Sequence, residues 1–213
     1  MKPLYYLIRN ILKGIFKLFY RHKVYGLEHY ISGSGIIAPN HISFLDPPII
    51  AVSWPEEIAF LARKSLFQKP ILGSLISNLN AYPVSGSHND RSSIKIITSL
   101  IQNGKKVVIF PEGYRSADGH LTEMKSGIAM IALRTQCPII PAYIEGSYDI
   151  WSRHQRFPKL WGKTVCVFGS SIDTQRYNHL AKKEAQEVIA DQVRDSIEAL
   201  KTWYHAGAEG IPP

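Results

Sequence analysis

A short apolar run leads directly into a histidine and an aspartate in the stretch Gly35-Ile36-Ile37-Ala38-Pro39-Asn40-His41-Ile42-Ser43-Phe44-Leu45-Asp46. The apolar run at 35–38 predicts a buried strand. His41 and Asp46 are typical of a base and its orienting partner, because a carboxylate bound to one ring nitrogen leaves the other ready to accept a proton. Five positions along a regular helix turn through roughly 140°, so the two side chains meet only in a loop or a broken helix start.

The same pair also has a simpler interpretation. Asp46 can cap a helix whose first residue is Pro47, since Asp favours the cap position and Pro fits the first turn. His41 would then be a solvated loop histidine. The stretch alone leaves both interpretations open.

Further short apolar runs alternate with helical patterns along the chain. Strands are expected near Gly35 to Ala38, Ile58 to Leu61, Ala81 to Val84, Lys106 to Phe110, Ile139 to Ile144 and Thr164 to Phe168. Helices are expected over Ile71 to Asn78, Asp90 to Gln102, Lys125 to Thr135 and about His179 to Tyr204, followed by a frayed tail at Gly207 to Pro213. This alternation predicts an α/β fold with a largely parallel or mixed sheet flanked by helices.

A second polar loop follows the predicted strand at 106–110. It reads Phe110-Pro111-Glu112-Gly113-Tyr114-Arg115-Ser116. Parallel strands place such loops at the same sheet edge as His41. Arg115 could bind a phosphate in a two-pronged manner, and Gly113 would let backbone approach a ligand. Lys64 adds a cation at another strand end, although an ordinary surface turn and a solvated lysine remain open.

Length and composition indicate one globular domain. The chain has 213 residues, 45% of them hydrophobic and 20% charged, which suffices for a sizeable core. We expect a single domain over residues 26–213, preceded by a separate segment at 1–25. Cys137 and Cys166 are the only cysteines, and the apolar surroundings of Cys166 fit a buried thiol in a reducing compartment.

The N-terminal segment predicts an amphipathic helix over Met1 to Arg21. One half of its projection carries Leu4, Leu7, Ile8, Ile11, Leu12, Ile15, Phe16, Leu18 and Phe19, and the other carries Arg9, Asn10, Lys13, Lys17 and Arg21. Its apolar run is far shorter than the roughly 20 residues that a spanning helix needs. A basic, aromatic-bearing helix of this kind is typical of a membrane surface. The alternative is a helix docked on the domain's own core.

The basic charge is local to this segment. The formal net charge is +8, and six of the basic residues precede the first acid, Glu28, leaving 19 basic and 17 acidic residues in the remainder. This balance argues against a nucleic-acid-binding body. The sequence also lacks a phosphate-binding P-loop, a Gly-x-Ser-x-Gly elbow and histidines at metal-site spacing, so we expect no metal.

Together the two loops resemble the first and third signature blocks of the glycerolipid acyltransferase family, which includes bacterial lysophosphatidate acyltransferases. Asn40-His41-x-Ser43-x-x-Asp46 matches the first block, and Phe110 to Ser116 matches the third. Lys64 with the following Lys69 to Gly73, Lys125-Ser126-Gly127 and the proline-containing run Ile139 to Ile144 resemble the intermediate and later blocks. The matches cover roughly residues 35–146 in the family's order. They favour the catalytic interpretation of His41.

The resemblance implies acyl transfer from acyl-CoA or an acyl carrier protein to the free hydroxyl of a lysolipid. The implied acceptor is 1-acylglycerol-3-phosphate, which would give phosphatidic acid. His41 would act as general base, oriented by Asp46, and a backbone N–H around Gly113 would stabilise the oxyanion. Lys64 would help to bind phosphate, and Glu112 and Arg115 would hold either the acceptor or their own loop. No cofactor is implied beyond the co-substrate.

Two positions depart from the family pattern. Tyr114 replaces the usual Thr of the third block, and Ser85 stands where the second block carries an arginine associated with the acceptor's phosphate. Arg91, six residues on, could substitute for it. The alternatives are therefore another acceptor, such as a lyso-ornithine lipid or another lysophospholipid, or a non-catalytic peripheral lipid-binding protein. The expected location is the cytoplasmic face of the bacterial inner membrane, where the helix would meet membrane lipids.

Overall fold

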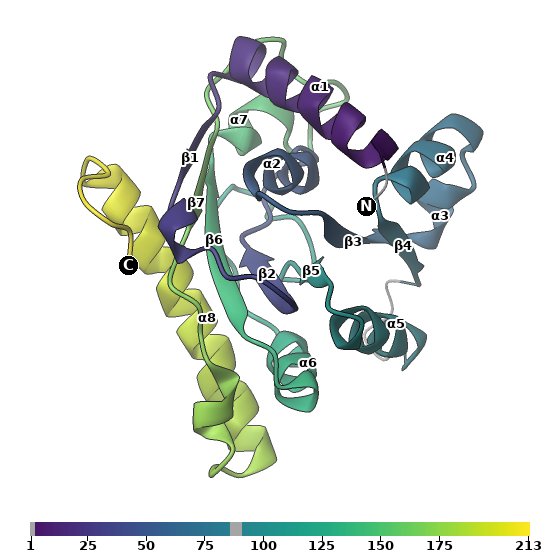
Figure 1. Cartoon of the computed structure of the whole chain (residues 1–213). Coiled ribbons are helices and arrows are strands. Elements are labelled where there is room, and N and C mark those ends of the chain that lie inside the picture. The colour runs from purple at the N-terminus through teal and green to yellow at the C-terminus, as the bar shows by residue number, and fades with distance from the viewer. Residues whose placement is uncertain (1–2, 86–90) are drawn as a thin grey trace.

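A seven-stranded sheet with helices on both faces forms the body of the protein (Figure 1). The computed structural model describes residues 3–85 and 91–213. The strands are β1 (Lys23–Tyr25), β2 (Gly35–Pro39), β3 (Ile58–Arg63), β4 (Ala81–Val84), β5 (Lys106–Val108), β6 (Ile139–Glu145) and β7 (Val165–Phe168). The helices are α1 (Pro3–Tyr20), α2 (Asp46–Ser53), α3 (Lys64–Phe67), α4 (Pro70–Asn78), α5 (Arg91–Gln102), α6 (Gly127–Thr135), α7 (Ser147–Trp151) and α8 (Lys182–His205).

The sheet is mixed, as the sequence predicts. Its strands lie in the order β1-β7-β6-β2-β5-β3-β4. Neighbouring strands from β6 to β4 are parallel, whereas β6 and β7 are antiparallel and β1 runs parallel to β7. The carboxyl ends of β2, β3, β5 and β6 therefore meet at one edge, which is where such sheets place their sites.

Two apolar layers enclose the central strands. Ile36 of β2 faces a core built with α5, α6 and α8. Ile37, its neighbour in sequence, faces a core built with α1, α2 and α7. Successive strand residues point to opposite faces, so a strand covered on both sides is apolar at every position. This double coverage explains the continuous apolar runs in the sequence.

Helix α1 is docked along one side and exposed along another. Tyr5, Phe16 and Tyr20 are buried against the body. Arg9 lies on this docked side, where its guanidinium donates to the carbonyls of Ala51, Trp54 and Pro55 at the end of α2. Arg9, on the polar half of the helical projection, therefore contacts the body rather than lying free of it. A second apolar stripe is exposed and contains Leu4, Leu7, Ile11, Ile15 and Leu18. No helix among the described residues is both long and apolar enough to span a membrane.

The ends of the chain differ from the sequence-based expectation. β1 lies within the N-terminal segment expected at 1–25, but it pairs with β7 at the edge of the sheet. The tail is tied down, because Ser170 N–H donates to the Pro213 carbonyl at 3.1 Å and His29 Nε2 lies 2.7 Å from the Pro212 carbonyl. The expectation of a frayed tail was wrong, since these bonds join residues far apart in sequence. Asp90, the predicted start of α5, lies outside the described residues.

Candidate active site

The loop after β2 is fixed at its start by Asn40. Its side-chain amide donates to the Ile144 carbonyl at 3.0 Å, and its carbonyl oxygen accepts from the Ile144 N–H at 2.7 Å. The buried amide thus imitates a strand backbone and ties the loop to β6. The next residue, His41, leaves the sheet from a rigid position.

His41 and Asp46 meet as a hydrogen-bonded pair. His41 Nδ1 lies 2.8 Å from Asp46 Oδ2, with the histidine side chain 16% exposed and the aspartate fully buried. Since an ionised carboxylate can only accept, Nδ1 carries the ring proton and Nε2 holds the free lone pair. This is the tautomer that a general base requires.

The Asp46 carboxylate is satisfied by the loop that precedes it. Its Oδ2 atom also accepts from the N–H groups of Ile42 and Ser43 at 2.7 Å each, and its Oδ1 atom accepts from the Ser147 hydroxyl at 2.7 Å. Asp46 is the first residue of α2 and not its cap, since the cap position is Leu45. The helix-cap interpretation was therefore wrong. Four donors therefore hold the buried carboxylate in place and satisfy its oxygens.

The histidine ring rests on the second loop. The His41 and Phe110 rings stack with centroids 3.9 Å apart and an interplanar angle of 21°. The His41 carbonyl accepts from the Ser116 N–H at 2.8 Å. These contacts bring the first and third sequence blocks together, as the sequence predicts.

Glu112 joins three segments from a fully buried position. Its Oε1 atom accepts from the His41 N–H at 2.6 Å, and its Oε2 atom accepts from the Thr122 hydroxyl at 2.6 Å and its N–H at 3.1 Å. Burial raises the pKa of this carboxyl, while the hydrogen bonds from Thr122 and His41 oppose the rise. Both oxygens are used within the protein. Glu112 is therefore a positioning residue that holds its own loop, the second of the two roles considered above.

Gly113 makes the tight turn of this loop. Its φ of +76° is strained for other residues, and a Cβ atom there would lie 2.9 Å from Lys125 Nζ. The Gly113 N–H donates to the Phe110 carbonyl at 3.0 Å. The N–H of Gly113 itself is thus engaged in the turn, so an oxyanion donor from the backbone around Gly113 would have to be a neighbouring N–H.

Arg115 is the centre of a cationic group beside the histidine loop. Its guanidinium lies 3.5 Å from the Phe44 ring centroid, and its Nη1 atom is buried without a hydrogen-bond partner in the described part of the chain. Desolvation lowers the pKa of Arg115, and the charges of Arg63 and Arg153 lower it further. Arg153 also donates to the Arg115 carbonyl at 3.3 Å. The charges of Arg63 and Arg153 thus act on Arg115 while the Asp46 carboxylate opposes them, and an anion bound beside Arg115 would reduce this repulsion.

Lys64 and Ser85 lie at the same sheet edge as the histidine loop. Lys64 is exposed as the first residue of α3, at the same sheet edge. Ser85 follows β4, whose last residue, Val84, pairs in register with Arg63. Arg63 therefore occupies the neighbouring strand end beside the position where the family arginine is missing. Arg91 begins α5 beyond residues that lie outside the described chain.

Several positioning residues were missed from the sequence. Ser147, Thr122 and Arg153 contact the site from segments that carry no recognised motif. Only the three-dimensional neighbourhood reveals them. Asn40 was quoted in the first block, but its pairing with β6 could not be seen without the sheet order.

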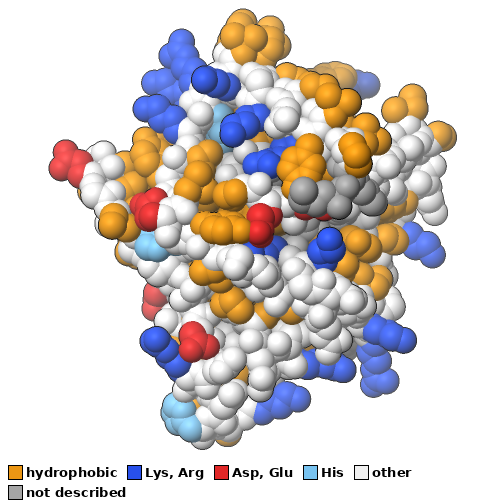
Figure 2. All heavy atoms as spheres, viewed as in Figure 1, with side chains coloured by type: hydrophobic (Ala, Val, Ile, Leu, Met, Phe, Trp, Pro, Cys, Tyr) orange, Lys and Arg blue, Asp and Glu red, His pale blue; other side chains and the backbone are white. Residues whose placement is uncertain are grey.

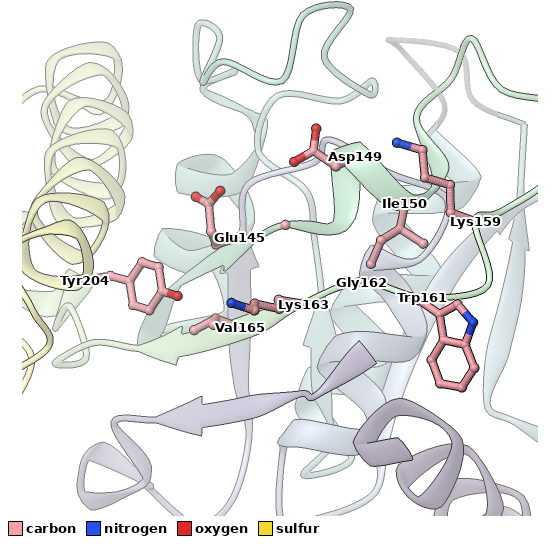
Figure 3. A pocket seen from close by; sticks show the side chains of 10 residues that line it. Glu145, Asp149, Ile150, Lys159, Trp161, Gly162, Lys163, Val165 and Tyr204 are labelled. Carbon is pink, nitrogen blue, oxygen red and sulfur yellow. The ribbon is translucent and has the colours of Figure 1, made fainter. Parts of the chain in front are cut away.

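Two hollows lie near the sheet edge. One of about 210 Å³ is bordered by Phe110 and Gly113 and lined by apolar side chains of α5 and α6, including Ile94, Ile128 and Ile131. The other, of about 360 Å³, lies between α7, the end of α8 and the segment before β7, with Asp149, Lys159, Trp161 and Tyr204 at its border (Figure 3). Only the first hollow touches a residue that contacts His41.

Comparison with known proteins agrees with this geometry. The family model described as Acyltransferase matches residues 21–145. The chain belongs to the acyltransferase family.

Relatives of known name support the assignment. This acyltransferase is 30% identical to the 1-acyl-sn-glycerol-3-phosphate acyltransferase of Bacillus subtilis over 93% of the chain and 97% of the relative. It is 30% identical to a chloroplastic enzyme of that name from Brassica napus over 62% of the chain, but spans only 39% of that longer relative. The crystal structure of the PlsC LPA acyltransferase from Thermotoga maritima superposes with a TM-score of 0.72 at 26% identity, covering 92% of this chain and 81% of that one.

Proposed function

We propose that this acyltransferase moves a fatty acyl group from a thioester to the free 2-hydroxyl of 1-acylglycerol-3-phosphate, giving phosphatidic acid. The observation that carries the proposal is the pairing of His41 with the buried, fully hydrogen-bonded Asp46. This pairing orients the imidazole and leaves Nε2 available to take the proton of an attacking alcohol.

The chemistry needs no covalent enzyme intermediate. The acceptor hydroxyl gives its proton to His41 Nε2 while its oxygen bonds to the thioester carbonyl carbon. The carbon–sulfur bond then breaks, and the leaving thiolate takes the proton from the imidazolium. Asp46 stabilises the imidazolium between these two steps. General-base assistance of this kind contributes about 10²- to 10⁴-fold.

The three guanidinium groups suit the acceptor's phosphate. Arg115 is already partly desolvated, and Arg63 and Arg153 add positive charge around it. A phosphate bound there would satisfy the buried Nη1 of Arg115 and remove the mutual repulsion. In this proposal Arg63 compensates for Ser85, and Lys64 adds a further cation at the same edge.

The apolar hollow beside Phe110 suits part of an acyl chain. Its lining is mainly apolar, with Ser93 and Lys125 as the polar members, and it opens next to the ring that stacks on His41. An acyl chain there would present its carbonyl carbon near the catalytic pair. Neither acyl-CoA nor an acyl carrier protein is favoured as donor by this hollow.

The exposed stripe of α1 suits a membrane surface. Its apolar side chains lie beside Lys13 and Lys17, and the helix contains no acid. Such a helix lies in the lipid interface, where a lysolipid acceptor resides. We therefore propose peripheral binding to the cytoplasmic face of the inner membrane.

A thioester-release assay tests the function directly. Acyl-CoA and acyl carrier protein donors are each combined with lysophosphatidate, a lyso-ornithine lipid and a zwitterionic lysophospholipid in detergent micelles. The proposal expects the highest kcat/KM with lysophosphatidate, and Arg115→Gln should reduce that preference. Equal or higher rates with the other acceptors would contradict the proposed acceptor, and the departure at Ser85 would then favour another lysolipid.

A further inference from the structure

The segment between α7 and β7 carries large apolar side chains on the surface. Phe157 is 71% exposed, Leu160 is 63% exposed and Trp161 is 62% exposed. Large apolar side chains grouped in this way on a solvent-exposed surface indicate an interaction site.

This segment is held firmly at both ends. At the end near the active site, Arg153 donates to the Arg115 carbonyl, and His154 Nε2 lies 2.9 Å from the Ala117 carbonyl. At the other end, the Trp161 and Phe19 rings have centroids 4.9 Å apart, and the Gly162 N–H donates to the Phe19 carbonyl at 3.1 Å. The segment therefore connects the catalytic loops to the end of α1.

The segment meets α1 at the end of the helix, next to its exposed stripe. Leu18, on the last turn of α1, is 67% exposed, and the neighbouring Phe19 contacts Trp161. Figure 2 shows hydrophobic side chains along the upper edge of the molecule, where Figure 1 places α1, with Lys and Arg side chains beside them.

The charge of the segment is uniformly positive. Residues 152–164 contain four cations and no acid; the cations are Arg153, Arg156, Lys159 and Lys163. Helix α1 also lacks acids. Exposed aromatic and aliphatic side chains with flanking cations are complementary to an anionic lipid surface, where Trp favours the headgroup level.

We propose that the 157–161 segment is a second membrane-binding element, which inserts Phe157, Leu160 and Trp161 into an anionic lipid surface beside α1. A helix axis and a second contact beside it define a plane, whereas the helix alone leaves the body free to rotate about that axis. The segment begins in contact with the loop that carries Arg115. Binding of both elements would therefore also fix the orientation of the His41 and Arg115 loops relative to the lipid surface. The inference rests on the proposed function for the presence of a lipid acceptor, but not on the chemistry of transfer.

A vesicle-binding experiment on the full chain tests the proposal. The variant carries Phe157→Ser and Leu160→Ser, two side chains that lie outside the buried core. The matched control is Ile211→Ser, which is 70% exposed at the other end of the chain. Binding is measured by sedimentation with phosphatidylcholine vesicles with and without 30% phosphatidylglycerol.

We expect the double variant to partition into the anionic vesicles about 10-fold more weakly than wild type, and the control to change by less than about two-fold. Trp161→Phe should remove most quenching of tryptophan fluorescence by brominated lipid while keeping the contact with Phe19. Unchanged partitioning of the double variant would overturn the proposal. So would a loss of rate confined to the carrier-protein donor, which would assign the segment to an acidic protein partner.

Activity separates this inference from the proposed function. In detergent micelles the double variant should retain wild-type turnover, while its activity on vesicle-borne acceptor falls with its binding. A wild-type protein that forms no phosphatidate in micelles would contradict the proposed function alone.

Discussion

His22 and His41 are both fixed by hydrogen bonds at their ring nitrogens, but they use them differently. His22 lies 2.9 Å from the Thr164 hydroxyl through Nδ1 and 2.8 Å from the Ser53 hydroxyl through Nε2. His41 uses Nδ1 for the Asp46 carboxylate, and the described residues offer its Nε2 no hydrogen-bond partner. Both nitrogens of His22 are hydrogen-bonded to hydroxyl groups. In His41 one nitrogen is hydrogen-bonded to a carboxylate and the other is available.

The surroundings of the two rings lead to different roles. Burial lowers the pKa of His22 to about 4, although its hydrogen bond with Thr164 opposes this effect. His22 thus stays neutral and joins α1, α2 and the start of β7. His41 faces the catalytic loops and a buried negative charge that can stabilise its protonated form. A histidine with both nitrogens satisfied supports the fold, whereas one with a carboxylate and a free nitrogen can transfer protons.

Replacing His41 should give the largest effect. In His41→Ala, kcat should fall by about 10⁴-fold, because the base is lost while the folded structure stays intact. Thioester release measures the rate, and thermal unfolding confirms the fold. His179→Ala, at an exposed position, is the control and should keep wild-type activity. A folded His41→Ala protein with more than a tenth of wild-type kcat would remove the distinction between the two histidines.

Asp46→Asn should have the next largest effect. An amide cannot accept all the bonds that the carboxylate accepts, and it no longer stabilises the imidazolium. We expect kcat to fall by about 10²- to 10³-fold and the free energy of unfolding to fall by about 2 kcal/mol. Steady-state kinetics and urea denaturation measure the two changes. Wild-type kcat in this variant would show that His41 needs no carboxylate.

The pH dependence of stability tests His22. Its pKa is about 4 in the folded protein and near 6.5 when unfolded, so below pH 6.5 the unfolded state binds more protons. The free energy of unfolding should therefore fall by about 3 kcal/mol between pH 7 and pH 4 through this residue. His22→Asn should lose this part of the pH dependence while keeping kcat in micelles. Denaturant titrations at several pH values measure it, and identical pH profiles for variant and wild type would contradict the role.

Ser147→Ala should give the smallest effect. It removes one donor to Asp46 Oδ1, which should lower the free energy of unfolding by about 1 kcal/mol and kcat by a few-fold. Ser171→Ala, at an exposed position, is the control for loss of a serine hydroxyl. A change in stability without any change in kcat would mean that the remaining three donors suffice to position Asp46.

Sequence patterns predicted the features that depend on local order. The apolar runs gave β2 and β6 within a residue because both faces are covered, and the block order gave His41, Asp46 and the Phe110 to Ser116 loop. Features that depend on contacts between residues far apart in the chain could not be predicted from the sequence. β1 has only three residues and little apolar character, so its pairing with β7 follows from the tertiary fold. The turn that occupies the Gly113 N–H and the approach of Ser147 and Arg153 likewise depend on the sheet order.

The most direct test of the account is rapid mixing of the enzyme with acyl-CoA in micelles, with and without lysophosphatidate, while thiol release is followed. If His41 activates the acceptor hydroxyl, no stoichiometric burst of thiol appears without acceptor, and release begins at once with phosphatidate formation when acceptor is present. A burst of one thiol per enzyme without acceptor would reveal an acyl-enzyme and contradict the assignment of His41 as the base for direct transfer.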